Sequence, residues 1–408
     1  MDGIAVDTFV ARQPIFDLQR AVHGYELLFR SGPENVFHFT DPDVASSRVV
    51  DDGLHVFGLN RLAGKKAVFV NLTHRLLEED LAFVLPPKST VVEILETVEP
   101  DDAVVEACRR LRHAGYRIAL DDFTFRPEME PLLELANVVK VDFRATDAGT
   151  RRDLVALLLP RKIRLLAEKV ETAEEFREAV EMGYSYFQGY FFARPEMVAR
   201  RDIPAFKLNY IRFLHELSQV ELDFGRLEKI IKSEVSLSVR LLRYLNSAAL
   251  GLRCRVSSIR HALALLGEGP MRRWAYLVAM AGIGRDKPAE LVVTSLIRAR
   301  FCELIGASCG RSSKAPDLFL VGTLSMVDAL MGRPIEEVMK ELLVSDEIKE
   351  TILHRATSLS AVFELVLAYE RGNWDDVAGL AQQLHLPEEA LPTHYFQAMD
   401  WAQQIFAL

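Results

Sequence analysis

Two adjacent carboxylates, Asp121 and Asp122, directly follow a short apolar run, Arg117-Ile118-Ala119-Leu120. An acidic pair at the end of a strand can bind a metal ion, because hard divalent cations prefer oxygen ligands. In the alternative reading, one Asp caps a following helix and the other is solvated, which is the commoner arrangement for an isolated pair. Other apolar runs of the chain also end in Glu, Asn, Asp, Lys or Gln, and this repetition favours a metal site.

Short β-rich runs alternate with helical patterns from Thr8 to about Pro195, which is typical of repeated β-α units. We expect helices at Asp101 to Ala114 and Glu174 to Met182, each followed by a glycine. A (β/α)8 barrel needs eight strands, and at roughly 190 residues some of its helices must be short or missing. The eight candidate strands are Phe9 to Pro14, Val22 to Phe29, Ala67 to Leu72, Thr90 to Leu95, Arg117 to Asp121, Val138 to Phe143, Arg164 to Glu168 and Tyr186 to Phe191.

In such barrels the functional side chains lie at the C-terminal ends of the strands, where the loops converge on one rim. Carboxylate and amide oxygens without histidine or cysteine indicate Mg2+ or Mn2+ rather than zinc. The polar residues expected at this rim are Glu26, Asn71, Glu93, Asp121, Asp122, Lys140, Glu168 and Gln188.

The residues expected at the rim lie in seven short motifs: Tyr25-Glu26-Leu27-Leu28-Phe29-Arg30, Val70-Asn71-Leu72, Glu93-Ile94-Leu95-Glu96, Asp121-Asp122-Phe123, Lys140-Val141-Asp142, Ala167-Glu168-Lys169-Val170-Glu171 and Gln188-Gly189-Tyr190. In this order, the motifs resemble those of the EAL domain, a barrel that hydrolyses the bacterial second messenger cyclic di-GMP to linear pGpG. The resemblance spans the whole first half and implies an EAL-type (β/α)8, TIM-like barrel.

The resemblance also implies a two-metal phosphodiesterase, in which two ions about 3.5 to 4 Å apart activate water and stabilise in-line attack. It implies Glu168 as general base, Lys140 as the residue that orients water or neutralises charge, and Gln188 as a ligand- or water-binding residue. Arg30 would bind phosphate, and Gln13 would also bind the ligand. The implied metal ligands are Glu26, Asn71, Glu93, Asp121 and Asp122, with Asp121 as the bridge.

Two departures from the family pattern bear on activity. After Phe123 the family has a glycine-rich loop, whereas this chain has residues 124–131 with two prolines, Pro127 and Pro131, so the loop is stiffer. Glu96, which would anchor that loop, lacks its usual partners. Lys169 replaces the family glycine beside the base, where a cation could lower the pKa of the carboxylate or cross the substrate cleft. A complete ligand set with a rewritten loop is compatible with a slow enzyme or with a binding-only sensor.

From about Ile203 the strands stop and helical periodicity indicates an all-α bundle, with Pro204 at the junction. Residues 241–249 and 257–267 resemble the HDOD domain, a helical relative of the metal-dependent HD phosphohydrolases. No histidine of the chain is followed by Asp, and Leu324-Ser325-Met326 stands where a catalytic relative would have Leu-His-Asp. We therefore expect no hydrolase chemistry in this half. Helices are expected at Phe206 to Val220, Phe224 to Ile231, Val235 to Leu245, Glu290 to Ile305, Asp317 to Leu330, Ile335 to Leu343 and Leu359 to Glu370.

Single polar residues of this half receive structural interpretations. A lone histidine such as His261 is more often a surface or core residue than a ligand, and Asn246 and Ser247 more often cap or bridge helices. Arg371-Gly372-Asn373-Trp374 predicts a turn entering a helix, and Trp374 and Trp401 are expected in the core.

The chain of 408 residues predicts two domains, 1–202 and 203–408. A net charge of -9 without a sustained basic stripe argues against binding of nucleic acid polymers. Four scattered cysteines without a CxxC pair, and the lack of a signal segment or long apolar run, indicate a cytoplasmic protein with no membrane span.

The leading hypothesis is a cyclic di-GMP phosphodiesterase whose HDOD half regulates it or binds a protein partner. The rival hypothesis is a degenerate EAL module that acts as a nucleotide sensor or scaffold. A third reading, in which the acids form only a structural ion network, leaves their shared placement unexplained. A homodimer is compatible with the sequence.

Overall fold

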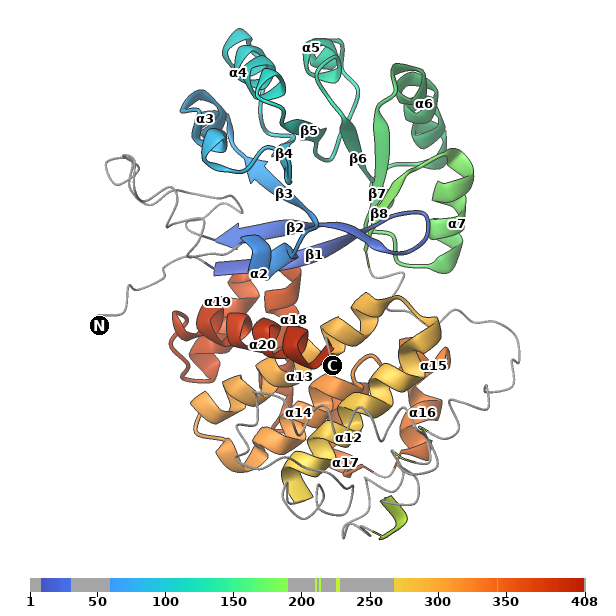
Figure 1. The fold of residues 1–408 in the computed structure, drawn as a ribbon, viewed down its shortest axis with the longest axis vertical. Coiled ribbons are helices and arrows are strands. Elements are labelled where there is room, and N and C mark those ends of the chain that lie inside the picture. Colours follow the sequence, from blue (N-terminus) through green and yellow to red (C-terminus); the bar gives the residue numbers. More distant parts are fainter. Residues whose placement is uncertain are drawn as a thin grey trace. The chain divides into compact units, whose positions relative to one another are not determined.

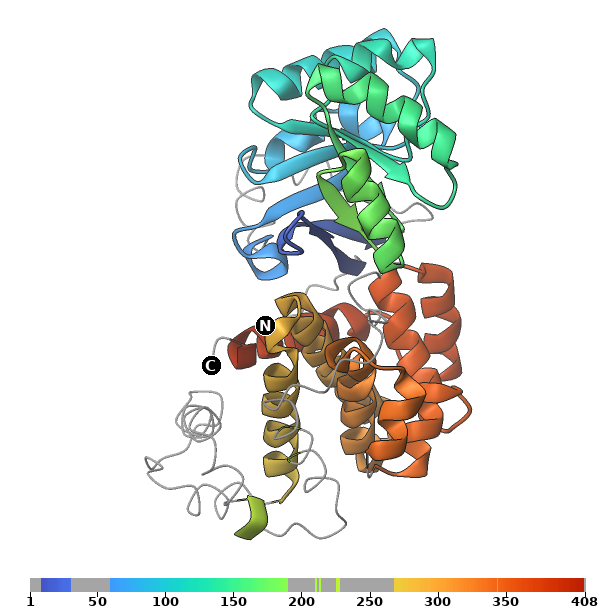
Figure 2. The same cartoon turned by 90° about the vertical axis from the view of Figure 1, so that its right-hand side faces the viewer.

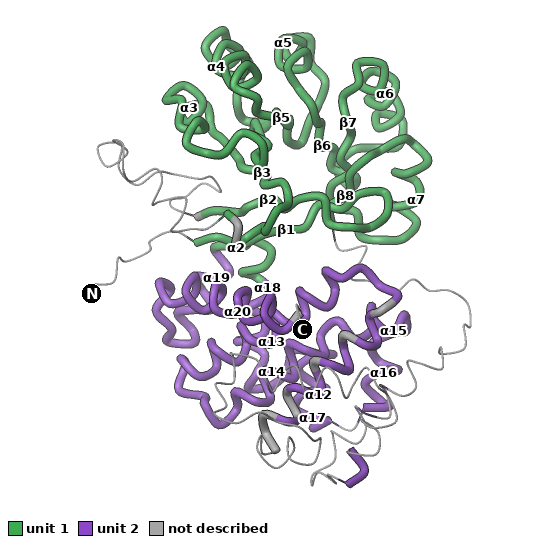
Figure 3. Tube along the Cα trace, viewed as in Figure 1, with its two compact units in different colours: residues 1–192, 368–374 green, residues 193–367, 375–408 purple. Residues whose placement is uncertain are grey.

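The computed structural model describes residues 9–30, 59–189, 210, 213, 225–227, 268–342 and 344–406. The chain divides into two compact units, shown in different colours in Figure 3. The first contains residues 1–192 together with 368–374, and the second contains residues 193–367 and 375–408. The short segment 368–374 therefore groups with the first unit although it lies far along the chain. The domain boundary at 202 stays a prediction.

The first unit is a closed barrel in which the strands follow one another in sequence order (Figure 1). This arrangement confirms the predicted barrel, and the expected strands are all present, with ends that differ by at most three residues. The strands are β1 (Phe9–Phe16), β2 (Val22–Arg30), β3 (Ala67–Leu72), β4 (Thr90–Ile94), β5 (Arg117–Leu120), β6 (Val138–Asp142), β7 (Arg164–Glu168) and β8 (Tyr186–Gln188).

One strand departs from a regular (β/α)8 barrel, because β1 runs antiparallel to both of its neighbours, β2 and β8. Residues 17–21 join β1 to β2 in a tight turn, in which the backbone N–H of Ala21 donates to the Asp17 carboxylate at 2.9 Å. A connection this short can join only antiparallel strands, since a parallel crossover needs a dozen or more residues. The turn length therefore fixes the direction of β1.

Helices lie outside the strands, as Figures 1 and 2 show. Both expected helices are present, as α4 (Asp102–His113) and α7 (Ala173–Met182). Asp101 caps α4 by accepting from Val104 N–H at 2.9 Å, and α7 begins with a capping box formed by Thr172 and Glu175. The helices are α2 (Leu59–Ala63), α3 (His74–Glu78), α4 (Asp102–His113), α5 (Glu130–Leu133), α6 (Ala148–Leu158) and α7 (Ala173–Met182), so several are as short as the compact barrel requires.

A layer of buried apolar side chains fills the barrel interior below the polar rim: Ile15, Phe69, Val91, Ala119, Val138, Leu166 and Tyr186. Side chains two residues apart on a strand point to the same face of the sheet. Asn71, Glu93, Asp121, Lys140, Glu168 and Gln188 each follow one of these residues by two positions. The core layer therefore directs the polar side chains into the same barrel, one layer closer to the C-terminal rim.

The second unit is helical, as expected. Its helices are α12 (Glu268–Ile283), α13 (Ala289–Ser308), α14 (Ala315–Leu324), α15 (Val327–Met331), α16 (Ile335–Glu341), α17 (Asp346–Leu353), α18 (Ser360–Arg371), α19 (Trp374–Gln383) and α20 (Ala390–Phe406), with part of α18 and the start of α19 in the barrel unit. Gly322 of α14 lies so close to α13 that a Cβ there would be 2.5 Å from the Ala299 backbone. The helix expected at Asp317 to Leu330 breaks at Ser325 and Met326 into α14 and α15.

Several predictions for this half concern residues outside the described part of the chain. They include most of the helices expected between Phe206 and Leu245, together with Asn246, Ser247, Cys254 and His261. Trp374 is buried, as expected, and Trp401 is partly buried with its ring edge-on to Phe319 at 5.9 Å. Among the described helices, none has the length and apolarity that a bilayer crossing demands.

Candidate metal centre

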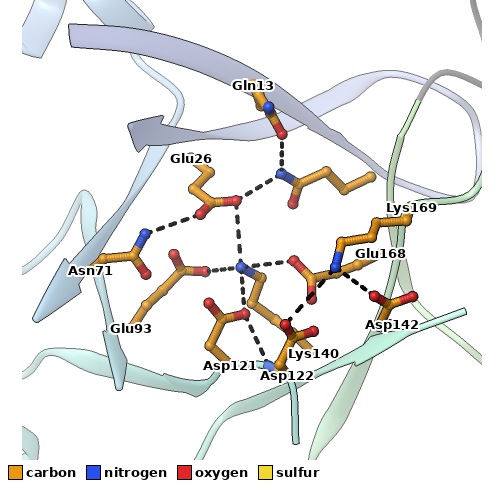
Figure 4. Close-up of polar contacts among 11 residues, drawn as sticks. Gln13, Glu26, Asn71, Glu93, Asp121, Asp122, Lys140, Asp142, Glu168 and Lys169 are labelled. Atoms are coloured by element: carbon orange, nitrogen blue, oxygen red, sulfur yellow. Dashed lines mark hydrogen bonds and ion pairs between the residues drawn. The ribbon is translucent and has the colours of Figure 1, made fainter. Parts of the chain in front are cut away.

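The ammonium group of Lys140 lies at the centre of the polar layer (Figure 4). Its Nζ is 2.9 Å from Asp121 Oδ1, 2.9 Å from Glu168 Oε1, 3.0 Å from Glu93 Oε1 and 3.4 Å from Glu26 Oε2. The Lys140 side chain is only 1% exposed. One buried cation therefore holds together four carboxylates, three from the strands β2, β4 and β7 and one from the residue that follows β5.

Side-chain amides position the Glu26 carboxylate from both sides. Asn71 Nδ2 donates to Glu26 Oε1 at 3.1 Å, and Gln188 Nε2 donates to Glu26 Oε2 at 2.7 Å. Gln188 Nε2 also donates to Gln13 Oε1 at 3.0 Å. Gln188 therefore links Gln13 to the Glu26 carboxylate.

The helix-capping reading of the Asp121-Asp122 pair is wrong. The next short helical turn begins at Pro127 after Arg126, with no side-chain cap. Asp121 instead accepts a hydrogen bond from the Asp122 backbone N–H at 3.1 Å, and Asp122 has a positive φ of 37°. Asp121, Asp122 and Glu168 each place one oxygen within 4.8 Å of the others, close enough to hold an ion together.

Burial and mutual repulsion control the ionisation of the cluster. Burial, reinforced by Glu26 and Asp121, raises the pKa of Glu93 well above its ordinary range despite Lys140. Burial likewise raises the pKa of Glu168 to about 8, with Asp121 and Glu26 adding to the effect. Burial acts to lower the pKa of Lys140, but the four carboxylates outweigh it and raise that pKa well above its ordinary value. Without further positive charge, Lys140 stays charged and some carboxylates hold protons.

Three buried oxygens of the polar layer have neither a hydrogen bond nor an ion pair within the described chain: Asn71 Oδ1, Glu93 Oε2 and Gln188 Oε1. Leaving a buried acceptor unsatisfied costs about 1 to 3 kcal/mol, so such groups in one place indicate a missing partner. All are hard oxygen donors, and the excess of carboxylates over Lys140 is a charge that divalent cations would balance. The residues present therefore fit hard divalent cations.

Lys169 introduces a second cation at the rim. Its Nζ is 2.5 Å from Asp142 Oδ2 and 3.9 Å from Asp122 Oδ2, and its φ of 54° lies in the left-handed region that favours glycine. Asp142 was not among the residues predicted for the site. Its position two residues after Lys140 on β6 could have shown that the two side chains share a face.

The segment after Phe123 packs differently from a flexible glycine-rich loop. Phe123 is buried and its N–H donates to the Lys140 carbonyl at 3.1 Å. Pro127 starts a 3-10 turn, which α5 follows directly with Pro131 in its first turn. Glu96 is exposed. The stiffness expected from the prolines is therefore matched by ordered secondary structure.

The structure brings together nearly all of the predicted site residues at one end of the barrel: Gln13, Glu26, Asn71, Glu93, Asp121, Asp122, Lys140, Glu168 and Gln188. The exception is Arg30, the last residue of β2, whose side chain lies outside the described part of the chain. The individual roles of these residues stay predictions.

In the helical unit, Ser325 stands where the Leu-His-Asp motif of a catalytic HD relative would have its histidine. Its hydroxyl donates to the Gly322 carbonyl at 2.8 Å and accepts from Arg298 Nη1 at 2.8 Å. Nearby, burial raises the pKa of Asp328 to about 6. Ser325 thus makes structural hydrogen bonds between the helices.

Sequence comparisons identify both halves. The EAL domain model matches residues 60–195, and the HDOD domain model matches residues 203–358. The protein YuxH of Bacillus subtilis, itself described as uncharacterized, is 36% identical over 405 residues, which cover 97% of this chain and 98% of YuxH. The cyclic di-GMP phosphodiesterase CdgJ of Vibrio cholerae is 34% identical over 401 residues, which cover 98% of this chain and 93% of CdgJ.

A third relative shares only the first half. The cyclic di-GMP phosphodiesterase RocR of Pseudomonas aeruginosa is 32% identical over 144 residues, which cover 32% of this chain and 36% of RocR. Among solved structures, a calcium and cyclic di-GMP complex of Klebsiella pneumoniae BlrP1 is 23% identical with a TM-score of 0.37, covering 48% of this chain and 58% of BlrP1. With relatives matched over nearly its entire length, this chain belongs to the family of proteins that join an EAL domain to an HDOD domain.

Proposed function

We propose that this protein is a metal-dependent phosphodiesterase that hydrolyses cyclic di-GMP to linear pGpG in its barrel. Its HDOD half, proposed as residues 203–408, serves as a regulatory or protein-interaction module, and residues 1–202 form the catalytic domain. The sequence relatives CdgJ and RocR, named as cyclic di-GMP phosphodiesterases, support the substrate.

One observation carries the metal dependence: the polar layer contains more buried carboxylate than its lysine neutralises. Four carboxylates surround the single ammonium group of Lys140, and Asp122 adds a fifth at the rim. A phosphodiester adds further negative charge, so an anionic substrate would be repelled unless cations entered first. Two Mg2+ or Mn2+ ions, held by Glu26, Asn71, Glu93, Asp121 and Asp122, would supply Lewis acidity and lower the pKa of bound water.

The remaining residues have distinct roles in this proposal. Glu168 accepts the proton of the attacking water, and Lys140 holds the Glu168 carboxylate in place while it does so. Gln188 and Gln13 orient Glu26 through their shared hydrogen bonds, and Arg30 would bind a substrate phosphate. Burial of the cluster strengthens each of these electrostatic interactions relative to water.

A second candidate function is a cyclic di-GMP sensor with little or no turnover. The segment after Asp122 favours this alternative, because its two prolines and the short helix α5 restrict the movement that positions Asp122 in the family pattern. Asp122 is also the most loosely held of the proposed ligands, with its side chain 41% exposed.

The deciding experiment incubates purified full-length protein with cyclic di-GMP and Mg2+ or Mn2+ and follows pGpG by chromatography. Glu26→Ala serves as the control that removes a proposed metal ligand. Turnover by the wild type that is lost in Glu26→Ala, and lost after EDTA treatment, supports the enzyme. Tight binding of cyclic di-GMP without product supports the sensor, and absence of both at high micromolar ligand rejects the nucleotide reading.

A second variant tests the proposed base. Glu168→Gln keeps the size of the side chain and one oxygen but cannot accept the proton, so we expect retained cyclic di-GMP affinity and a rate reduced at least about 100-fold. Equal loss of affinity and rate would contradict the role of Glu168 as base.

A further inference from the structure

The segment 368–374 packs on the barrel through specific buried contacts. The Tyr369 hydroxyl donates to the Val10 carbonyl at 3.1 Å, and both residues are fully buried. The Trp374 ring lies 5.9 Å from the Phe9 ring and 5.3 Å from the Tyr369 ring. The sequence analysis predicted a turn here, but the HDOD match ends at residue 358 and assigns the segment no role.

The glycine of this turn faces the strand that contains Glu26. Gly372 has a φ of +71°, and a Cβ at this position would lie 2.7 Å from Leu28 Cδ1 and 3.3 Å from Leu28 Cβ. Leu28 follows Glu26 by two residues on β2, so their side chains lie on the same face of the strand. Gly372 is therefore in contact with the face of β2 that presents a proposed metal ligand.

Strand register places these contacts near the metal end of the barrel. β1 and β2 pair antiparallel with Ala11 opposite Leu28 and Gln13 opposite Glu26. The residues touched by the segment thus lie on the side of Glu26 that leads to the C-terminal rim, rather than toward the apolar core layer at Ile15.

A chain of hydrogen bonds connects the segment to Glu26 through Gln13 and Gln188. Gln13 Nε2 donates to the Arg371 carbonyl at 3.4 Å, while Gln13 Oε1 accepts from Gln188 Nε2 at 3.0 Å. The same Gln188 Nε2 donates to Glu26 Oε2 at 2.7 Å. The Arg371 carbonyl therefore fixes the direction of the Gln13 amide, and Gln13 fixes that of Gln188.

We propose that residues 368–374 are a positioning element of the metal centre, which holds Glu26 in place through Gly372–Leu28 packing and the Arg371–Gln13–Gln188 hydrogen bonds. This inference rests on the proposed function in taking Glu26 as a metal ligand. Partners behind a metal ligand typically change metal affinity by about 10- to 100-fold when they are lost. In sequence, the segment lies between the part of α18 and the part of α19 that belong to the second unit.

The chain offers a closely matched pair of substitutions for a test. Gly372→Ala adds a methyl group against Leu28 at φ +71°, whereas Gly310→Ala adds one at φ +72° with nothing within 4 Å. Both substitutions therefore introduce the same backbone strain, and only the first presses on β2. The double variant Gly372→Ala/Leu28→Ala removes the closest contact, at 2.7 Å, and leaves only the one with the Cβ of residue 28 at 3.3 Å. Leu28→Ala alone controls for lost packing.

The primary measurement is the affinity of full-length protein for Mn2+ alone, from the electron paramagnetic resonance signal of free Mn2+. We expect Gly372→Ala to weaken binding about tenfold relative to Gly310→Ala, and the double variant to recover most of the loss relative to Leu28→Ala. If Gly372→Ala fails to fold, Tyr369→Phe is the variant to measure. This substitution keeps the ring and removes one hydroxyl, and it should weaken Mn2+ binding severalfold.

Equal Mn2+ affinity in Gly372→Ala and Gly310→Ala would overturn the inference, whether or not cyclic di-GMP is hydrolysed. If the wild type binds no Mn2+, the proposed function fails, and hydrogen exchange of the amides of residues 25–28 decides the positioning role separately. Faster exchange in Gly372→Ala than in Gly310→Ala supports it, and equal exchange overturns it.

Discussion

Replacing Lys169 should strengthen metal binding, because its ammonium group competes for the carboxylate of Asp122. Burial acts to lower the pKa of Lys169, but the hydrogen bond with Asp142 and the nearby Asp122 raise it above its ordinary value, so Lys169 is a cation at neutral pH. A divalent ion bound to Asp122 would carry charge of the same sign. The two cations must therefore repel each other.

The structure sets the size of this repulsion. Lys169 Nζ is 3.9 Å from Asp122 Oδ2, and a Mg2+ ion lies about 2.1 Å from its ligand oxygen, so the two cations would be separated by at most about 6 Å. Coulomb's law gives about 1.4 kcal/mol for charges of one and two at that distance in water. The high dielectric constant applies because the Lys169 side chain is 55% exposed. Removing the charge should therefore raise metal affinity about tenfold.

Three substitutions separate charge from backbone strain. Lys169→Ala removes the charge but keeps a non-glycine residue at φ 54°, whereas Lys169→Gly removes the charge and also the strain. Lys169→Arg keeps the charge. Mn2+ titration by electron paramagnetic resonance should show both neutral variants binding about tenfold more tightly, with a difference that shrinks at high salt.

The substitution Asp142→Asn should change Mn2+ affinity in the opposite direction. This substitution removes the partner of Lys169 at 2.5 Å and leaves the ammonium group free to move toward Asp122, so Mn2+ binding should weaken. The reasoning is refuted if Lys169→Ala binds Mn2+ no more tightly than the wild type, since Lys169 would then be orienting Asp122 rather than competing with the ion.

Two further predictions concern buried charges. Burial raises the pKa of Asp328 from 3.8 to about 6, so its ionisation opposes folding: the penalty is absent below pH 3.8, grows as pH rises through 6 and is complete above it. Urea unfolding should show Asp328→Asn to be more stable than the wild type by about 3 kcal/mol at pH 8 and equal near pH 3.5; an equal difference at both values would contradict the pKa assignment. Lys140→Met should destabilise the metal-free protein by about 3 to 5 kcal/mol, because its carboxylates lose their shared counter-ion. Saturating Mn2+ should reduce this loss, and an unchanged unfolding midpoint in EDTA would show that the carboxylates are neutralised in another way.

The sequence predicted most of the site because the barrel repeats one rule on every strand. Phe69 and Asn71 on β3, or Ala119 and Asp121 at the end of β5, illustrate a buried apolar residue followed two positions later by a polar one. Local alternation is sufficient for such a prediction, since the closed barrel turns equivalent positions of different strands toward one axis. The short connection 17–21 would also have predicted that β1 runs antiparallel to β2, although this direction was not among the predictions.

Other features depend on contacts that local patterns do not contain. The pairing of Lys169 with Asp142 joins the ends of neighbouring strands through side chains, at a Lys169 whose φ is positive. Docking of residues 368–374 on β1 and β2 joins positions separated by 359 residues in the case of Tyr369 and Val10. The break between α14 and α15 coincides with a tertiary hydrogen bond from Arg298 to Ser325, whereas the sequence there keeps its helical periodicity.

The choice between enzyme and sensor depends chiefly on the carboxylate of Asp122. Asp121 is 14% exposed and bonded to Lys140 at 2.9 Å, so the barrel itself fixes it. Asp122 lies beyond the strand end, its side chain is 41% exposed, and its oxygen Oδ2 is 3.9 Å from the Lys169 ammonium group. Burial and the neighbouring Asp121 raise the pKa of Asp122, and a nearby positive charge would act to lower it. Binding of a first ion by the barrel residues would supply such a charge, whereas binding of a second ion requires Asp122 to displace Lys169. In the proposed mechanism, a site that completes this second step would hold the two ions used for hydrolysis, and a site that stops at the first step would still bind the nucleotide as a sensor.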